Sequence, residues 1–155
     1  MVVMLIFVLG SISLFISVLT LWSYIKWTDC KEILTREFYD KTKNYDNLKV
    51  SSSSYGKFKV MIGFKVETTI FVSAEKIIIV PSKMTLGLFQ TELPAKFNKK
   101  TKLVPTNIKI TAFNRVLIEC QKDTFSLGRV RVVYEIDAKN CKDKIEFIEK
   151  MKNWC

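Results

Sequence analysis

Residues 2–25 read VVMLIFVLGSISLFISVLTLWSYI, a run of 24 residues without a charged side chain. A helix rises 1.5 Å per residue, so this run would extend about 36 Å, enough to cross the roughly 30 Å hydrocarbon core of a bilayer. The first charge after it is Lys26. Aromatic residues, which gather at membrane interfaces, surround its end: Trp22, Tyr24 and Trp27. The sequence therefore predicts one retained membrane anchor over residues 1–27.

Two other interpretations of the run fit less well. A cleaved signal peptide has a basic amino-terminal region, a shorter apolar core and small residues before its cleavage site, whereas this run begins MVVMLIF and ends in bulky aromatics. A lipoprotein needs a cysteine directly behind the apolar core, and the first cysteine here is Cys30. Both comparisons favour an anchor that stays in the mature chain.

Basic residues near the run lie only on its C-terminal side, at Lys26, Lys31 and Arg36. Since basic residues within about 15–20 residues of a span stay in the cytoplasm, the rest of the chain is expected there. The sparse cysteines, expected as free thiols, fit a reducing compartment; they are Cys30, Cys120, Cys141 and Cys155. A Cys120–Cys141 disulfide in an exported domain is the alternative, and acylation of Cys30 beside the membrane is a weak pattern.

Residues 28–55 are expected to connect the anchor to a folded domain. Ile33, Leu34, Phe38 and Tyr45 have a spacing compatible with a helix over residues 28–47 that continues out of the membrane or lies on its surface. The run of four serines at 51–54, followed by Tyr-Gly, breaks this pattern and predicts a hinge.

From residue 56 onward the pattern predicts β-structure. In KFKVMIGFKV, Phe58, Val60, Ile62, Phe64 and Val66 share one face and Lys57, Lys59 and Lys65 take the other, which predicts a strand with one buried face. In RVRVVYEID the apolar residues alternate with charged ones in the same way. The seven expected strands cover residues 57–66, 68–72, 76–82, 86–93, 108–112, 116–120 and 129–137, with a longer loop at 94–105.

A closing amphipathic helix is expected near the C-terminus. Asp143 and Glu146 have the spacing of a capping box, and Phe147, Met151 and Trp154 follow at helical spacing, with Ile145 and Ile148 alongside. This order of strands and helix over residues 56–155 resembles the pleckstrin-homology-like (PH/GRAM) superfold. The resemblance implies two orthogonally packed antiparallel sheets, a barrel or sandwich of about seven strands, with the helix closing one open end.

The residue types argue against catalysis. The chain contains no histidine, which removes the commonest general base and metal ligand, so no metal or cofactor is expected. Ser-x-x-Lys patterns occur at Ser23/Lys26, Ser54/Lys57 and Ser73/Lys76, and we interpret them as chance matches in a lysine- and serine-rich chain. We therefore expect a non-enzymatic protein.

Charge indicates a different role. The net formal charge is +10, and lysines concentrate in the 94–105 loop and beside it, at Lys96, Lys99, Lys100, Lys102, Lys83 and Lys109. An anionic leaflet attracts such residues, although lysine-rich loops are also ordinary solvated surface. Nucleic acid is disfavoured as a partner because Phe58, Phe64, Phe71 and Tyr134 are in phase with the aliphatic core face rather than with the charged one.

Small residues follow one face of the anchor at Gly10, Ser13, Ser17 and Thr20. Such a face permits close packing of another transmembrane helix, from a partner or a second copy, although Ser and Thr also bond back to their own helix. Two functions follow as hypotheses. One is a non-catalytic, membrane-anchored interaction module that binds a protein partner, an anionic lipid surface or both. The alternative is an accessory structural subunit of a larger membrane complex.

Overall fold

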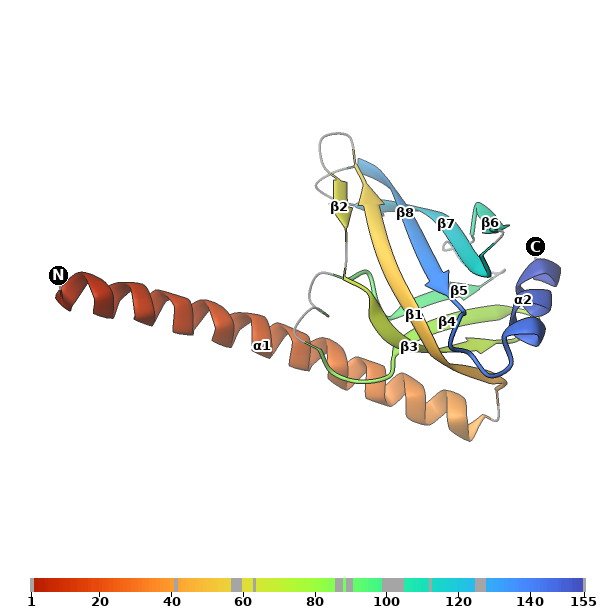
Figure 1. Ribbon diagram of the computed structural model, residues 1–155, viewed down its shortest axis with the longest axis horizontal. Helices are drawn as coiled ribbons and strands as arrows, with labels where there is room; N and C mark the ends of the chain where they lie inside the picture. The colour runs from red at the N-terminus through yellow and green to blue at the C-terminus, as the bar shows by residue number, and fades with distance from the viewer. Residues whose placement is uncertain are drawn as a thin grey trace.

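A computed structural model describes residues 2–40, 42–56, 60–62, 64–85, 88, 91–98, 105–111, 113–124 and 128–154. It confirms the predicted class: a long apolar N-terminal helix, a curled antiparallel sheet and a short C-terminal helix (Figure 1). The helices are α1 (Val2–Tyr39) and α2 (Lys144–Asn153). The strands are β1 (Asn44–Tyr55), β2 (Val60–Ile62), β3 (Val66–Val72), β4 (Lys76–Pro81), β5 (Ala95–Asn98), β6 (Asn107–Ile110), β7 (Arg115–Thr124) and β8 (Gly128–Asp137).

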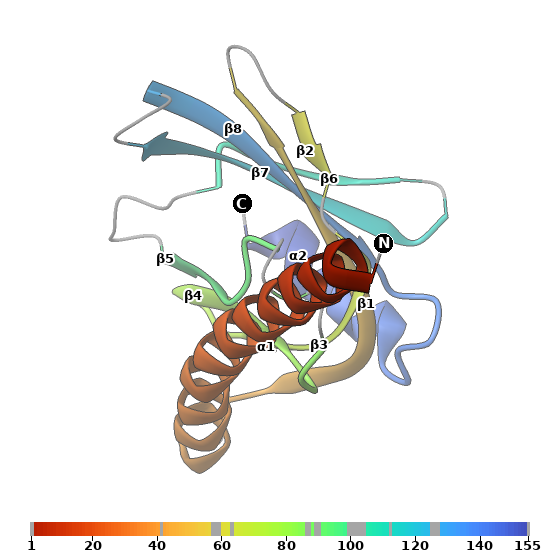
Figure 2. The ribbon, with the colours of Figure 1, turned by 90° about the vertical axis from the view of Figure 1, so that its left-hand side faces the viewer.

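The strands form one sheet in the order β5-β4-β3-β1-β8-β7-β6, with β2 paired to the end of β1. All of these pairings are antiparallel. Figure 2 shows the sheet folded over, with β3, β4 and β5 on one side, β6, β7 and β8 on the other, and β1 running between the two halves. The result is a half-barrel whose inner face encloses the hydrophobic core.

Strand β4, with the sequence KIIIVP, is apolar at every central position because both of its faces are buried. Ile77 and Ile79 point into the half-barrel, whereas Ile78 and Val80 pack outward with Phe71 against α1. Because both faces of β4 are covered, an alternating pattern is not required. The second half of α1 is thus the outer layer of this part of the protein.

Two contacts fix the direction of α1 along the sheet. Glu37, near the C-terminal end of α1, forms an ion pair with Lys76 at the start of β4 (2.5 Å). Lys26, eleven positions earlier in the helix, reaches the segment beyond the end of β4 and donates a hydrogen bond to the Thr91 carbonyl (2.7 Å). Strand β4 therefore runs antiparallel to α1. We call the end of the half-barrel toward the apolar part of α1 the near end, and the opposite one the far end.

Helix α2 closes the far end (Figure 1). Phe147, Met151 and Trp154 are buried, as predicted. The prediction for Ile145 was wrong: its side chain is 69% exposed. The capping box is also absent, since Asp143 makes no side-chain cap hydrogen bond. Glu146 instead accepts hydrogen bonds from Lys43 (3.0 Å) and Tyr45 (3.1 Å), which tie α2 to the start of β1.

The predicted linker was wrong over its second half. The expected helix over residues 28–47 ends at Tyr39, and the predicted hinge at 51–54 lies inside β1, the central strand of the sheet. The folded domain therefore starts at Asn44 rather than at residue 56. Serine has no β-propensity that would reveal this strand, and the serine run is held in place by pairing with β8 and with β2.

Two strand predictions also need correction. The described residues of 86–93 form no strand, and β5 lies instead at Ala95–Asn98, inside the predicted loop. In the predicted strand 57–66, residues 57–59 and 63 lie outside the described part of the chain, and Phe64 is 59% exposed rather than buried. The cysteines Cys30, Cys120 and Cys141 are free and buried, so the alternative disulfide is not formed.

Candidate functional site

The lysines predicted as a binding site do not form one cluster among the described residues. Lys83 follows β4 at the near end and pairs with Glu67 (2.6 Å). Lys96 and Lys109 are exposed on β5 and β6, the two edge strands of the sheet path. Lys99, Lys100 and Lys102 lie outside the residues that the structure describes.

The last described residue before those three lysines is Asn98, which pairs with Lys76. Lys76 is bound to Glu37, twelve positions after Ile25 in α1. At 1.5 Å per residue, Glu37 lies roughly 18 Å along the α1 axis from the end of the apolar run, and Asn98 lies at about the level of Glu37. Asn98, which directly precedes Lys99 in the sequence, is therefore remote from the near end.

The near end holds an arrangement that sequence reasoning missed, which we call the junction: Lys26, the described residues of segment 88–93, Ser52, Lys122 and Tyr134. The Lys26 ammonium donates hydrogen bonds to the carbonyls of Thr91 (2.7 Å) and Leu88 (3.4 Å). Leu88, Thr91 and Leu93 are buried. The segment is thus tucked into the near end of the half-barrel and held there from α1.

Glu92 connects the same segment to the rest of the barrel. Its backbone N–H donates to the Ser52 hydroxyl (3.1 Å), and its carbonyl accepts a hydrogen bond from the Tyr134 hydroxyl (3.2 Å). Its carboxylate forms an ion pair with Lys122 on β7 (3.0 Å). These bonds give buried Ser52 a partner, which explains one polar residue of the serine run inside the core.

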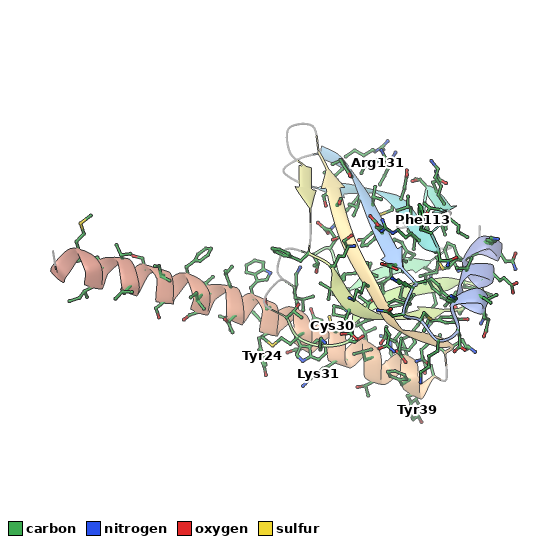
Figure 3. The ribbon with its side chains drawn as sticks, in the orientation of Figure 1. Tyr24, Cys30, Lys31, Tyr39, Phe113 and Arg131 are labelled. Carbon is green, nitrogen blue, oxygen red and sulfur yellow. The ribbon has the colours of Figure 1, made fainter. Side chains whose placement is uncertain are left out.

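The polar half of α1 carries a buried stripe at helical spacing, formed by Ser23, Cys30, Ile33 and Glu37, with Trp27 partly buried beside it. With Trp27 included, successive members are three or four residues apart, which places them on one face that packs on β3 and β4. Figure 3 shows Cys30 where α1 meets the sheet, while Tyr39 lies at the exposed end. This spacing is present in the sequence, but a face that contains Ser, Cys and Glu gives no apolar periodicity, so its burial was not predicted.

Replacement of Lys26 by methionine is expected to loosen the junction. It leaves two carbonyls of a buried segment without their charged donor, and a hydrogen bond to a charged group contributes about 1.5–3 kcal/mol. Hydrogen exchange of the Thr91, Glu92 and Leu93 amides should rise, while amides of α2 at the far end keep their protection. Unchanged exchange at these three amides would show that Lys26 does not hold the segment.

The predicted packing face of α1 is exposed along its described residues. A Cβ added at Gly10 would meet nothing within 4 Å. The Ser17 and Thr20 hydroxyls donate to the carbonyls of Ser13 and Ile16 (both 2.8 Å), so these two polar groups are satisfied within the helix. The face offers close approach, but two of its hydroxyl protons already have partners.

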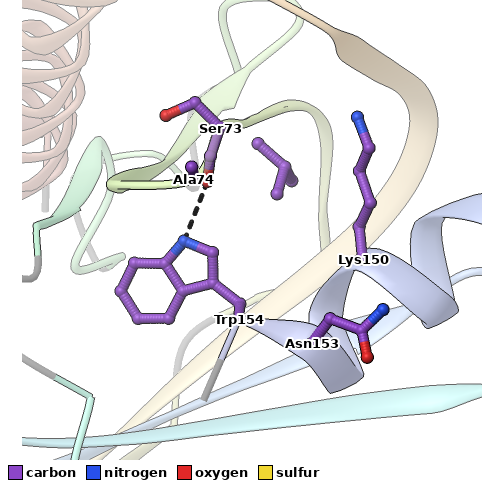
Figure 4. A pocket seen from close by; sticks show the side chains of 6 residues that line it. Ser73, Ala74, Lys150, Asn153 and Trp154 are labelled. Carbon is purple, nitrogen blue, oxygen red and sulfur yellow. Dashed lines mark hydrogen bonds between the residues drawn. The ribbon is translucent and has the colours of Figure 1, made fainter.

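A pocket of about 340 Å³ opens at the far end, between the β3–β4 turn and α2. Figure 4 shows Trp154 as one wall, with its indole N–H donating to the Ser73 carbonyl (3.0 Å). Lys150 and Asn153 form the opposite rim. The pocket combines one aromatic wall with one cationic group.

The described residues contain no group of three or more His, Cys, Asp or Glu side chains that could hold a metal ion. Burial raises the pKa of the Cys120 thiol to about 11, so the thiol is protonated and unreactive at neutral pH. The chain matches no protein-family model and no curated protein.

Alkaline pH is expected to destabilise the fold. Burial holds the pKa of Cys120 near 11, above its ordinary value of 9.0, and also raises the pKa values of Tyr45 and Tyr134. Above about pH 9 the unfolded chain therefore binds fewer protons than the folded one, and stability falls as pH rises. Thermal unfolding at pH 7 and pH 10.5 should show the loss, and Cys120→Ala should reduce it. A midpoint that does not change with pH would contradict the assignment.

Proposed function

We propose that the chain is a single-span membrane protein whose half-barrel is a non-catalytic interaction module at the cytoplasmic face. One observation carries this proposal: α1 is continuous from Val2 to Tyr39, with an uncharged, predominantly apolar first half and a second half packed on the sheet. Among the described residues it is the one helix long and apolar enough to cross a membrane. The domain is then held at a fixed angle to the span rather than on a flexible tether.

The apolar half of α1 has the surface expected of a span. Its large side chains are exposed, for example Phe7 at 74% and Leu14 at 69%, and none of the described parts of the fold covers them. Exposed apolar surface of this extent marks contact with lipid or another protein. Lys26, Lys31 and Arg36, which follow the span, support the cytoplasmic orientation.

The proposed partners are a protein, an anionic lipid surface or both. The net charge of +10 supports an acidic or anionic partner, and the far-end pocket beside Trp154 offers a contact site that faces away from the membrane. A half-barrel closed by a C-terminal helix is also compatible with membership of the PH-like superfold, which we infer from element order alone.

A second candidate is an accessory subunit of a larger membrane complex. The observation that favours it is the open face at Gly10, where no side chain of this chain lies within 4 Å of an added Cβ. Purification of the full chain in mild detergent distinguishes the two functions. A stoichiometric membrane protein that is lost from Gly10→Leu supports the subunit, whereas a partner lost from Lys150→Glu supports the module.

Orientation is tested with Phe113→Cys, because Phe113 is 81% exposed and lies on the side of the domain away from Tyr24 (Figure 3). In a Cys155→Ser background, an impermeant maleimide added to intact cells should leave this cysteine unlabelled until the membrane is opened. The buried thiols Cys30, Cys120 and Cys141 provide the background. Rapid labelling in intact cells would place the domain outside and overturn this part of the proposal.

A further inference from the structure

The near end of the half-barrel brings together two chain segments that are distant in sequence. The Ser82 N–H donates to the Glu67 carbonyl (2.9 Å), and Lys83 forms its ion pair with Glu67. The connection from β2 into β3, which contains Phe64 and Lys65, therefore lies beside the residues that follow β4. Figure 1 shows β2 and the start of β3 on the side of the domain toward the free half of α1.

The level of this end along α1 is set by Lys26. Its contact with Thr91 lies one residue beyond the apolar run, so Trp22 and Tyr24 are one turn away on the membrane side. Both are more than half exposed, at 59% and 58%. If α1 spans the bilayer, the near end lies where headgroups begin.

Phe64 is the unexplained residue at this end. It was expected in the core, but 59% of its surface is exposed, and exposed Lys65 follows it directly. Exposure of a single aromatic side chain does not by itself indicate a binding surface, since Phe113 is 81% exposed. What distinguishes Phe64 is its position at the near end, together with Lys65 and Lys83, whose side chain is 66% exposed.

We propose that the near end rests on the bilayer, with Phe64 in the interfacial layer and Lys65 and Lys83 against anionic headgroups. The inference rests on the proposed function only in that α1 must span the membrane. The continuity of α1 with the packed domain favours lipid over a protein at this end, because the span already brings the bilayer to it.

Weak contacts suffice for such docking. Each lysine near an anionic leaflet contributes about a fivefold gain in occupancy, and aromatic rings prefer the interface. Because α1 already holds the domain beside the bilayer, the contact forms without a separate association step. Phe64 and the lysines orient the near end rather than recruit it.

The test places a spin label at residue 64 with Phe64→Cys and, as a matched control, at residue 113 with Phe113→Cys, both in full-length Cys155→Ser chain. Each is reconstituted into nanodiscs of neutral lipid alone or with anionic lipid. Collision of the label with oxygen, which dissolves in lipid, is compared with collision with a water-soluble nickel complex. Circular dichroism first verifies that both variants are folded.

In anionic nanodiscs we expect the label at residue 64 to collide more often with oxygen than with the nickel complex. This preference should be smaller in neutral nanodiscs, and smaller when Lys65→Gln and Lys83→Gln are added. Residue 113 should favour nickel throughout. Equal immersion of residue 64 in neutral and anionic lipid would overturn the role of the lysines. Nickel exposure of residue 64 equal to that of residue 113 in both lipids would overturn the docking itself. Partner co-purification, measured separately, would show whether the proposed module still stands.

Discussion

Replacement of Lys76 by alanine is expected to destabilise the protein by about 3 kcal/mol, because it leaves the Glu37 carboxylate buried without its main partner. The Glu37 side chain is only 1% exposed, and its ion pair with Lys76 is the link between the end of α1 and β4. Arg36, half exposed and 3.5 Å away, replaces part of the lost charge, which places the effect at the lower end of the usual 3–5 kcal/mol. Thermal or urea unfolding of the full chain in detergent measures it.

Lys139→Ala is the matched control, since the Lys139 side chain is exposed and changes there are expected within about 0.5 kcal/mol. Replacement of both partners, Lys76→Met with Glu37→Leu, should recover most of the lost stability because no unpaired charge remains. A Lys76→Ala protein as stable as the Lys139→Ala control would show that α1 does not depend on this pair for its attachment.

Deletion of residues 143–155 is expected to unfold the half-barrel. It removes three large buried side chains, Phe147, Met151 and Trp154, each contributing about 1.5–3 kcal/mol of burial. The total approaches the roughly 5–15 kcal/mol that stabilises a whole domain. Near-ultraviolet circular dichroism and binding of a hydrophobic dye should both report the loss of the core.

Two point variants in α2 separate the effect of losing one buried side chain from the effect of removing the whole helix. Phe147→Ala should cost about 3–5 kcal/mol, whereas Ile145→Ala, at a side chain that is 69% exposed, should cost little. A truncated chain with an unchanged melting temperature, or equal effects at the two positions, would show that α2 does not close the far end.

Much of the fold could be predicted because periodicity reports burial on one face. The alternation in RVRVVYEID identified β8, and the spacing of Phe147, Met151 and Trp154 identified the buried face of α2. The serine run at 51–54 was misread as a hinge because its strand character comes from pairing with β8 and β2, which leaves no local trace. The prediction for Ile145 was wrong because only a narrow face of α2 meets the core, and Ile145 lies outside that face.

The junction could not be predicted because its parts are far apart in the chain. Lys26 looked like a charge that ends a membrane span, yet it also binds carbonyls 62 and 65 residues away. Glu37 lies on the expected connecting helix, and its partner Lys76 opens a strand 39 residues later. Polar residues buried by long-range pairs have no periodic signal of their own.

We expect α1 to attach the half-barrel rigidly to the proposed span. Spin labels at Tyr24→Cys and Phe113→Cys, on the exposed side of α1 and at the opposite part of the domain, report it directly in nanodiscs (Figure 3). Pulsed dipolar spectroscopy should give one narrow distance distribution, kept in Lys139→Ala and broadened in Lys76→Ala. A broad distribution in the unmodified background would mean that the domain swings on a flexible connection, and would contradict the account.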